Sequence, residues 1–152
     1  ALNDEITARQ AADAALAGQL ASIPKVYVAD GSTSNLKGAT ATVVARTVPA
    51  GTYFIQATVQ MVNGQNSGDA NARCVMRADG NLLADTSDLE FPVLADTSPN
   101  SATGATMFAP LHGTYTSASP IALVVECSEG NGDNGGLDAY AHIAALAVGT
   151  LQ

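Results

Sequence analysis

The stretch TYFIQATVQMV, residues 52–62, decides the fold. Its residues alternate, so that Tyr53, Ile55, Ala57, Val59 and Met61 share one face of an extended strand. Strict alternation is typical of a strand with one face on a core and the other on solvent. Pro49-Ala50-Gly51 precedes the stretch as a turn, and a polar segment, NGQNSGD, follows it. The segment therefore predicts a half-buried β-strand with its own turns.

Short stretches of the same kind recur along the rest of the chain. The other predicted strands cover residues 26–29, 40–48, 71–79, 89–94, 105–116, 120–128 and 137–152. About eight strands separated by turn signals predict an all-β sandwich or jelly roll.

Residues before Pro24 have a different composition, with no proline and one glycine, and are rich in helix-forming residues. We therefore predict two parts, a helical stalk over residues 1–23 and a β domain over 24–152. Residues spaced by three and four form one stripe on the helix. This stripe consists of Leu2, Ile6, Arg9, Asp13, Leu16, Leu20 and Ile23.

A helix of this length is marginal alone in water, so its stripe needs a partner surface. One interpretation is an amphipathic helix lying on the β domain. The other is a short parallel coiled coil between copies of the chain, in which Arg9 of one copy meets Asp13 of a neighbour and sets the register.

The predicted final strand is apolar on both faces, whereas a sandwich buries only one face of each strand. We therefore expect the second face to contact another subunit. The interface residues predicted there are Tyr140, His142, Leu146 and Val148.

Cys74 and Cys127 each lie on the apolar face of a predicted strand, so both point inward. They form either a disulfide across the core or two buried thiols. A disulfide is typical of an oxidising compartment or an exposed particle.

Charge and composition exclude several classes of function. The chain of 152 residues has a net charge of −8, and its six basic residues are scattered. Nucleic-acid binding is excluded because it needs a basic patch, and no apolar run is long enough to insert into a membrane. The first residue is Ala1 rather than Met, so we expect the chain to be processed or excised from a longer one.

No catalytic motif is present, and we expect a protein that is not an enzyme. His112 and His142 have no paired motif, and we interpret both as structural or interface residues. A group of acids, Asp85, Asp88, Glu90 and Asp96, is the only basis for an alternative, a glycan hydrolase. No cofactor is expected.

A glycine-rich segment, EGNGDNGGLD, is a candidate for calcium binding, because calcium prefers oxygen ligands. Its candidate ligands are Glu129, Asp133, Asn134 and Asp138. The same residues are typical of a hairpin tip.

Several of these segments resemble a known family. LNDEITARQAADAAL resembles the stalks of phage tail fibres and bacterial surface fibres. VPAGTYFIQATVQMVN, ARCVMRADG, PIALVVECSEGNG and AHIAALAVGTLQ resemble bacterial and phage jelly-roll heads of the complement and tumour necrosis factor type. The resemblance implies a homotrimeric head on a stalk and transfers no catalytic residue.

The resulting hypothesis is a non-enzymatic trimeric head of an extracellular, cell-surface or virion fibre. It attaches to a cell-surface glycan or protein receptor through segments 63–71, 85–104 and 129–138. The alternative is a purely structural domain that trimerises or caps a fibre. Phe108, Tyr115 and Tyr140 are the aromatics available to contact a sugar, but core packing is the expected role of each.

Overall fold

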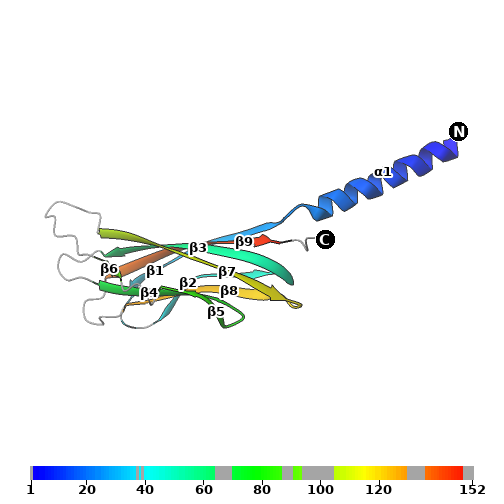
Figure 1. The fold of residues 1–152 in the computed structure, drawn as a ribbon. Helices are drawn as coiled ribbons and strands as arrows, with labels where there is room; N and C mark the ends of the chain where they lie inside the picture. The colour runs from blue at the N-terminus through cyan, green and yellow to red at the C-terminus, as the bar shows by residue number, and fades with distance from the viewer. Residues whose placement is uncertain are drawn as a thin grey trace.

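The chain folds as a two-sheet β-sandwich with one N-terminal helix (Figure 1). The computed structural model describes residues 2–36, 38, 40–63, 70–86, 91–93, 105–129 and 136–148. Its elements are α1 (Leu2–Ser22), β1 (Val26–Leu36), β2 (Ala41–Val48), β3 (Gly51–Asn63), β4 (Ala70–Ala78), β5 (Asn81–Asp85), β6 (Phe91–Val93), β7 (Ala105–Ser117), β8 (Ile121–Glu129) and β9 (Leu137–Ala147). The predicted all-β sandwich behind a helix is confirmed.

The strands form two antiparallel sheets. Sheet A has the order β1-β9-β3-β7, and sheet B has the order β2-β8-β4-β5, with β6 also pairing with β4. Apart from the β4–β5–β6 run, each strand lies in the opposite sheet from the strand before it. This alternation is the strand order of a jelly roll.

β5 was not among the predicted strands. It follows β4 through a two-residue turn in which Asp79 and Gly80 have φ angles of 49° and 79°. Two successive positive φ angles define the type I′ hairpin turn, for which Asp-Gly is a preferred sequence. The Asp79 carboxylate also accepts a hydrogen bond from the Ala122 N–H at 2.8 Å, which ties the hairpin to β8.

The core lies between the sheets and contains the alternating residues that the sequence predicts. On β3, Tyr53, Ile55, Ala57, Val59 and Met61 are all buried. From sheet B, the inward faces of β4 and β8 supply Cys74, Met76, Ala78, Ile121, Leu123, Val125 and Cys127. The intervening residues of β3 face outward, so the period of two sets the two faces of the strand.

Cys74 and Cys127 form a disulfide in the structure. The sequence-based prediction is that such a bond crosses the core from one sheet to the other. The observed bond instead joins two strands of one sheet. The two residues are register partners on neighbouring strands of sheet B, β4 and β8, with Cα atoms 4.1 Å apart. The opposite sheet contacts the bond through Met61, whose Sδ lies 3.7 Å from the Cys74 Sγ.

Gly31 allows β1 and β2 to cross closely at one edge of the sandwich. A Cβ atom added at this position would lie 2.1 Å from the Val43 carbonyl oxygen. We therefore expect Gly31→Ala to shift the backbone and lower the free energy of unfolding by about 2 kcal/mol.

Urea unfolding followed by circular dichroism measures this effect. Gly18→Ala is the matched control, since an added Cβ there has no atom within 4 Å and alanine favours helix. An unchanged midpoint for Gly31→Ala would show that β1 and β2 separate easily.

The helix projects away from the sandwich instead of lying on it (Figure 1). Residues 2–20 of α1 are all exposed. The interpretation in which the helix packs on its own β domain is therefore wrong, because the apolar residues of the stripe remain exposed in the single chain. No helix among the described residues is long and apolar enough to cross a membrane.

The two ends of the sandwich differ in their connections. The helix joins at the end where β1 begins, and the short connections at 49–50, 79–80 and 118–120 lie at the same end. The strand ends that flank 64–69, 94–104 and 130–135 lie at the opposite end, and 87–90 connects β5, which ends opposite Val75 of β4, with β6. These four segments contain most of the predicted attachment residues and are outside the described part of the chain.

Candidate assembly interface

The apolar residues of the predicted stalk stripe are open to solvent. Leu2, Ile6, Leu16, Leu20 and Ile23 keep between 46% and 72% of their surface exposed. These residues form two exposed apolar groups on one side of the helix, separated by Arg9 and Asp13, and exposed apolar patches mark interaction surfaces. The stripe is therefore available to another chain.

The polar centre of the stripe differs in detail from the expectation. Arg9 Nη2 lies 2.7 Å from Glu5 Oε1, one helical turn away in the same chain. Asp13 is exposed. A pairing of Arg9 with Asp13 between copies would therefore replace the Glu5 contact, and exposed pairs of this spacing contribute only about 0.3–0.5 kcal/mol.

Sheet A has a second exposed apolar group where the helix joins it. Val26 on β1, Leu146 on β9 and Phe54 on β3 are successive register partners across the sheet. Val28 and Val148 flank them, and all five are exposed. We call these five residues the proximal cluster. Leu146 and Val148 were predicted from the sequence, whereas Val26, Val28 and Phe54 were not.

A pair of aromatic residues is exposed farther from the helix on the same face. Phe108 on β7 is 62% exposed and Tyr140 on β9 is 47% exposed, and Gln60 on β3 is the register partner of both. The expectation that these two rings pack in the core is wrong. Tyr115 does pack against the core, and its hydroxyl lies 3.0 Å from the Asn81 Nδ2.

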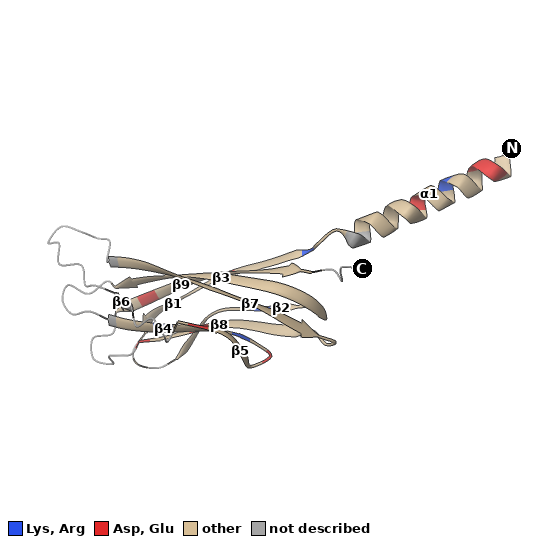
Figure 2. Cartoon of the chain, in the orientation of Figure 1, with Lys and Arg blue, Asp and Glu red and all other residues tan. Residues whose placement is uncertain are grey.

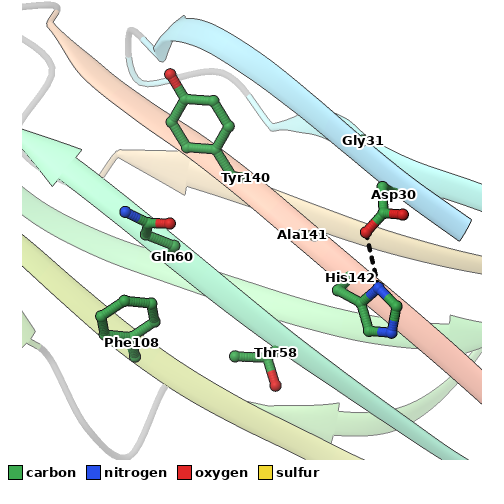
Figure 3. Close-up of a pocket in the computed structure, with 8 residues that line it drawn as sticks. All are labelled: Asp30, Gly31, Thr58, Gln60, Phe108, Tyr140, Ala141 and His142. Atoms are coloured by element: carbon green, nitrogen blue, oxygen red, sulfur yellow. Dashed lines mark hydrogen bonds and ion pairs between the residues drawn. The ribbon is translucent and has the colours of Figure 1, made fainter.

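The aromatic pair forms part of the lining of a shallow hollow of about 340 Å³ on this face (Figure 3). Its lining consists of Asp30, Gly31, Thr58, Gln60, Phe108, Tyr140, Ala141 and His142. Asp30 and His142 are register partners, and the His142 Nδ1 lies 2.7 Å from the Asp30 Oδ1. An imidazole N–H donates a hydrogen bond to the carboxylate in this geometry.

Charge is distributed unevenly between the two sheets. The four strands of sheet A contain no Lys or Arg, and their only carboxylates are Asp30 and Asp138. Figure 2 shows β3 and β7 without either charge colour. Sheet B instead has Arg46, Arg73 and Arg77 on its strands. The outer face of sheet A therefore has fewer charged residues than the outer face of sheet B. A second acidic chain that packs on sheet A buries fewer charges.

Arg73 and Arg77 of sheet B form ion pairs across its strands. Arg73 Nη2 lies 2.6 Å from Asp85 Oδ2, and Arg77 Nε lies 3.2 Å from Glu126 Oε2. The hydrogen bonds to Asp85 raise the pKa of the Arg73 guanidinium above its ordinary value. This face is typical of a solvated surface with exposed ion pairs.

The predicted catalytic acids do not form a described cluster. Asp85 is bound to Arg73, while Asp88, Glu90 and Asp96 lie outside the described residues. His112 is exposed on β7. The described part of the chain brings none of these residues together as an acid–base pair.

The four candidate calcium ligands are also not brought together by the described part of the chain. Asp133 and Asn134 lie outside the described residues, Glu129 ends β8, and Asp138 lies on β9 in the other sheet. The Asp138 carboxylate accepts a hydrogen bond from the Asn35 N–H at 3.0 Å, which supports the irregular end of β1. Among the residues described, no group of three or more His, Cys, Asp or Glu is placed to hold a metal.

No protein-family model matches the chain, and no curated protein matches its sequence. Solved structures do match its fold. The structure of the Gx strain of infectious bursal disease virus has a TM-score of 0.50 and 16% identity, over 85% of this chain and 34% of that one. The VP2 subviral particle of the same virus has a TM-score of 0.50 and 16% identity, over 83% and 33%.

A third match is the T13 viral particle of this virus, with a TM-score of 0.51 and 14% identity. The alignment covers 82% of this chain and 31% of the viral chain. The similarity lies in the fold alone. This chain spans about a third of the length of the viral proteins that it matches.

Proposed function

We propose that this chain is a non-enzymatic structural protein of a virion or surface fibre, in which three copies form a head on a coiled-coil stalk. One observation carries the proposal. The exposed apolar stripe of α1 ends where the proximal cluster of sheet A begins, on a face with no Lys or Arg in its strands. Copies that associate through their helices bring these faces together.

Three lines support the details of this proposal. The heptad-like spacing of the stripe favours a parallel bundle of helices. The sequence resembles trimeric jelly-roll heads, and the jelly-roll fold is shared with structures of viral particles. A disulfide between Cys74 and Cys127 suits an exposed particle better than a reducing cytosol.

Attachment to a cell-surface glycan or protein is the role that we propose for the end opposite the helix. The strand ends that flank the long connections lie there, and connections more often carry recognition than strands do. Three linked copies raise the effective concentration of each site, so weak single sites give stable attachment.

Light scattering on residues 24–152 and on residues 1–152 measures the mass of each assembly. The comparison shows whether the helix or the face of sheet A holds the copies together. The helix contributes no residue to the buried core, so the shorter chain retains its sandwich. We expect both chains to be trimers at micromolar concentration, with the shorter one dissociating first on dilution. A monomeric 24–152 would assign assembly to the stalk alone, and a monomer in both cases would contradict the proposal.

The alternative is a structural cap that binds no ligand. Replacing 64–69 and 130–135 with Gly-Ser segments of equal length distinguishes the two roles. For an attachment protein, we expect fluorescent trimers of the original chain to bind cells or a glycan array and the replaced chain to lose binding while remaining trimeric. Binding unchanged by the replacement would contradict attachment through these segments.

A further inference from the structure

The pair formed by Asp30 and His142 is the feature of sheet A that its proposed assembly role leaves unexplained. Asp30 is 79% and His142 is 52% exposed at the side chain, and their polar atoms are 2.7 Å apart. In the register of the sheet they lie between the row that contains Val28 and the row that contains Tyr140 and Phe108. A partner that covers both exposed apolar groups therefore also covers this pair.

We propose that association of copies through sheet A is strengthened by acid, with the Asp30–His142 pair as the group that senses pH. The inference rests on the proposed function, because the occupant of the face is a second copy of this chain. Histidine is the side chain whose charge normally changes between pH 8 and 5.

The direction of the pH effect on assembly follows from the net charge that assembly buries. When His142 is neutral, each copy contributes the single negative charge of Asp30 to the interface. When His142 is protonated, the pair has no net charge and the hydrogen bond becomes an ion pair. Burying an uncompensated carboxylate is less favourable than leaving it in water. Assembly therefore takes up protons, and acid favours it.

The other groups near the pair do not supply this response. On β9 itself, the outward neighbours of His142 are Tyr140 and Ala144, and Asp138, the next outward residue beyond Tyr140, accepts a hydrogen bond from the Asn35 N–H. On β3 the outward residues are Thr58 and Gln60, which do not titrate. On β7 the only titratable outward neighbour is His112, which lies in the adjacent row opposite Gln56. His112 is therefore the control histidine.

The test is the trimer dissociation constant of residues 1–152 at pH 8.0 and 6.0, measured by sedimentation with fluorescence detection. An exposed carboxyl group of ordinary pKa is ionised throughout this window, whereas an imidazole of ordinary pKa is not protonated throughout it. We expect the original chain to bind about tenfold more tightly at pH 6.0. His142→Asn should remove most of this difference, and His112→Asn should retain it.

Asp30→Asn is a more decisive variant, because it is expected to reverse the direction of the pH effect on trimer affinity. In that variant the neutral His142 is compatible with burial, whereas the protonated form has no carboxylate partner, so acid should weaken the trimer. Both side chains are exposed, and circular dichroism checks that each variant folds. A pH response that survives in His142→Asn, or keeps its direction in Asp30→Asn, overturns this inference alone. A monomer at both pH values overturns the proposed function as well.

Discussion

The paired substitution Phe54→Glu and Leu146→Glu is expected to convert the proposed trimer into folded monomers. The two residues are register partners at the centre of the proximal cluster and are both partly exposed in the single chain. The free sandwich tolerates the change because the new carboxylates face water. In the assembly each would be buried without a partner, at several kcal/mol apiece, which weakens association at least about a hundredfold.

The matched control is Leu82→Glu. Leu82 is a comparably exposed apolar residue, but it lies on β5 of sheet B, away from the proposed interface. Light scattering at micromolar concentration should show a trimer for this variant and a monomer for the paired one. The reverse pattern would move the interface to sheet B, and trimers in both cases would show that the stalk alone holds the copies together.

Removal of the disulfide by Cys74→Ala and Cys127→Ala is expected to have the largest effect on stability. The two cysteines are 53 residues apart in the chain. Closing a loop of that length restricts the unfolded chain by about 4 kcal/mol in the chain-entropy treatment. For a chain of this size we expect the unfolding midpoint to fall by about 10 °C.

Thermal unfolding at a fixed protein concentration measures this effect, because assembly itself raises the apparent midpoint. Adding a reductant to the original chain should lower its midpoint to that of the variant, and the variant itself should not respond. A loss below about 1 kcal/mol would show that the β4–β8 pairing already restricts the unfolded chain.

Strand alternation made most of the sandwich predictable. The faces of β3, β4 and β8 have a clear period of two, so their buried residues follow from the sequence. β5 is short and lacks that alternation, and the informative signal was the Asp79-Gly80 turn before it. Residues 30–36 are rich in small polar side chains, so the predicted first strand, 26–29, stopped short of the observed β1.

The phase of β7 explains why the exposure of Phe108 was not predicted, whereas Tyr140 on β9 was among the predicted interface residues. Met107, Ala109 and Leu111 form one possible apolar face, and Phe108 and Pro110 belong to the other. Apolar residues on both faces leave the inward side undetermined until the register with β3 is known. Whether the two cysteines lie in one sheet or in opposite sheets was undetermined from the sequence, since inward-facing residues of one strand can meet either sheet.

The placement of the helix was the other open question. Its apolar stripe was compatible with the β domain or with another chain, because spacing shows which residues share a face and not what covers them. Because the stripe is exposed in the single chain, packing of the helix on its own β domain is excluded. The exposed stripe also makes the copy number of the assembly the central claim about this protein.

The solution mass of residues 1–152, measured by light scattering on a sizing column at neutral pH, tests that claim most directly. A homotrimer has a mass of about 46 kDa, three times the 15.3 kDa of one chain. We predict this value at micromolar concentration. A mass near 15.3 kDa across the same concentrations would contradict the trimeric head.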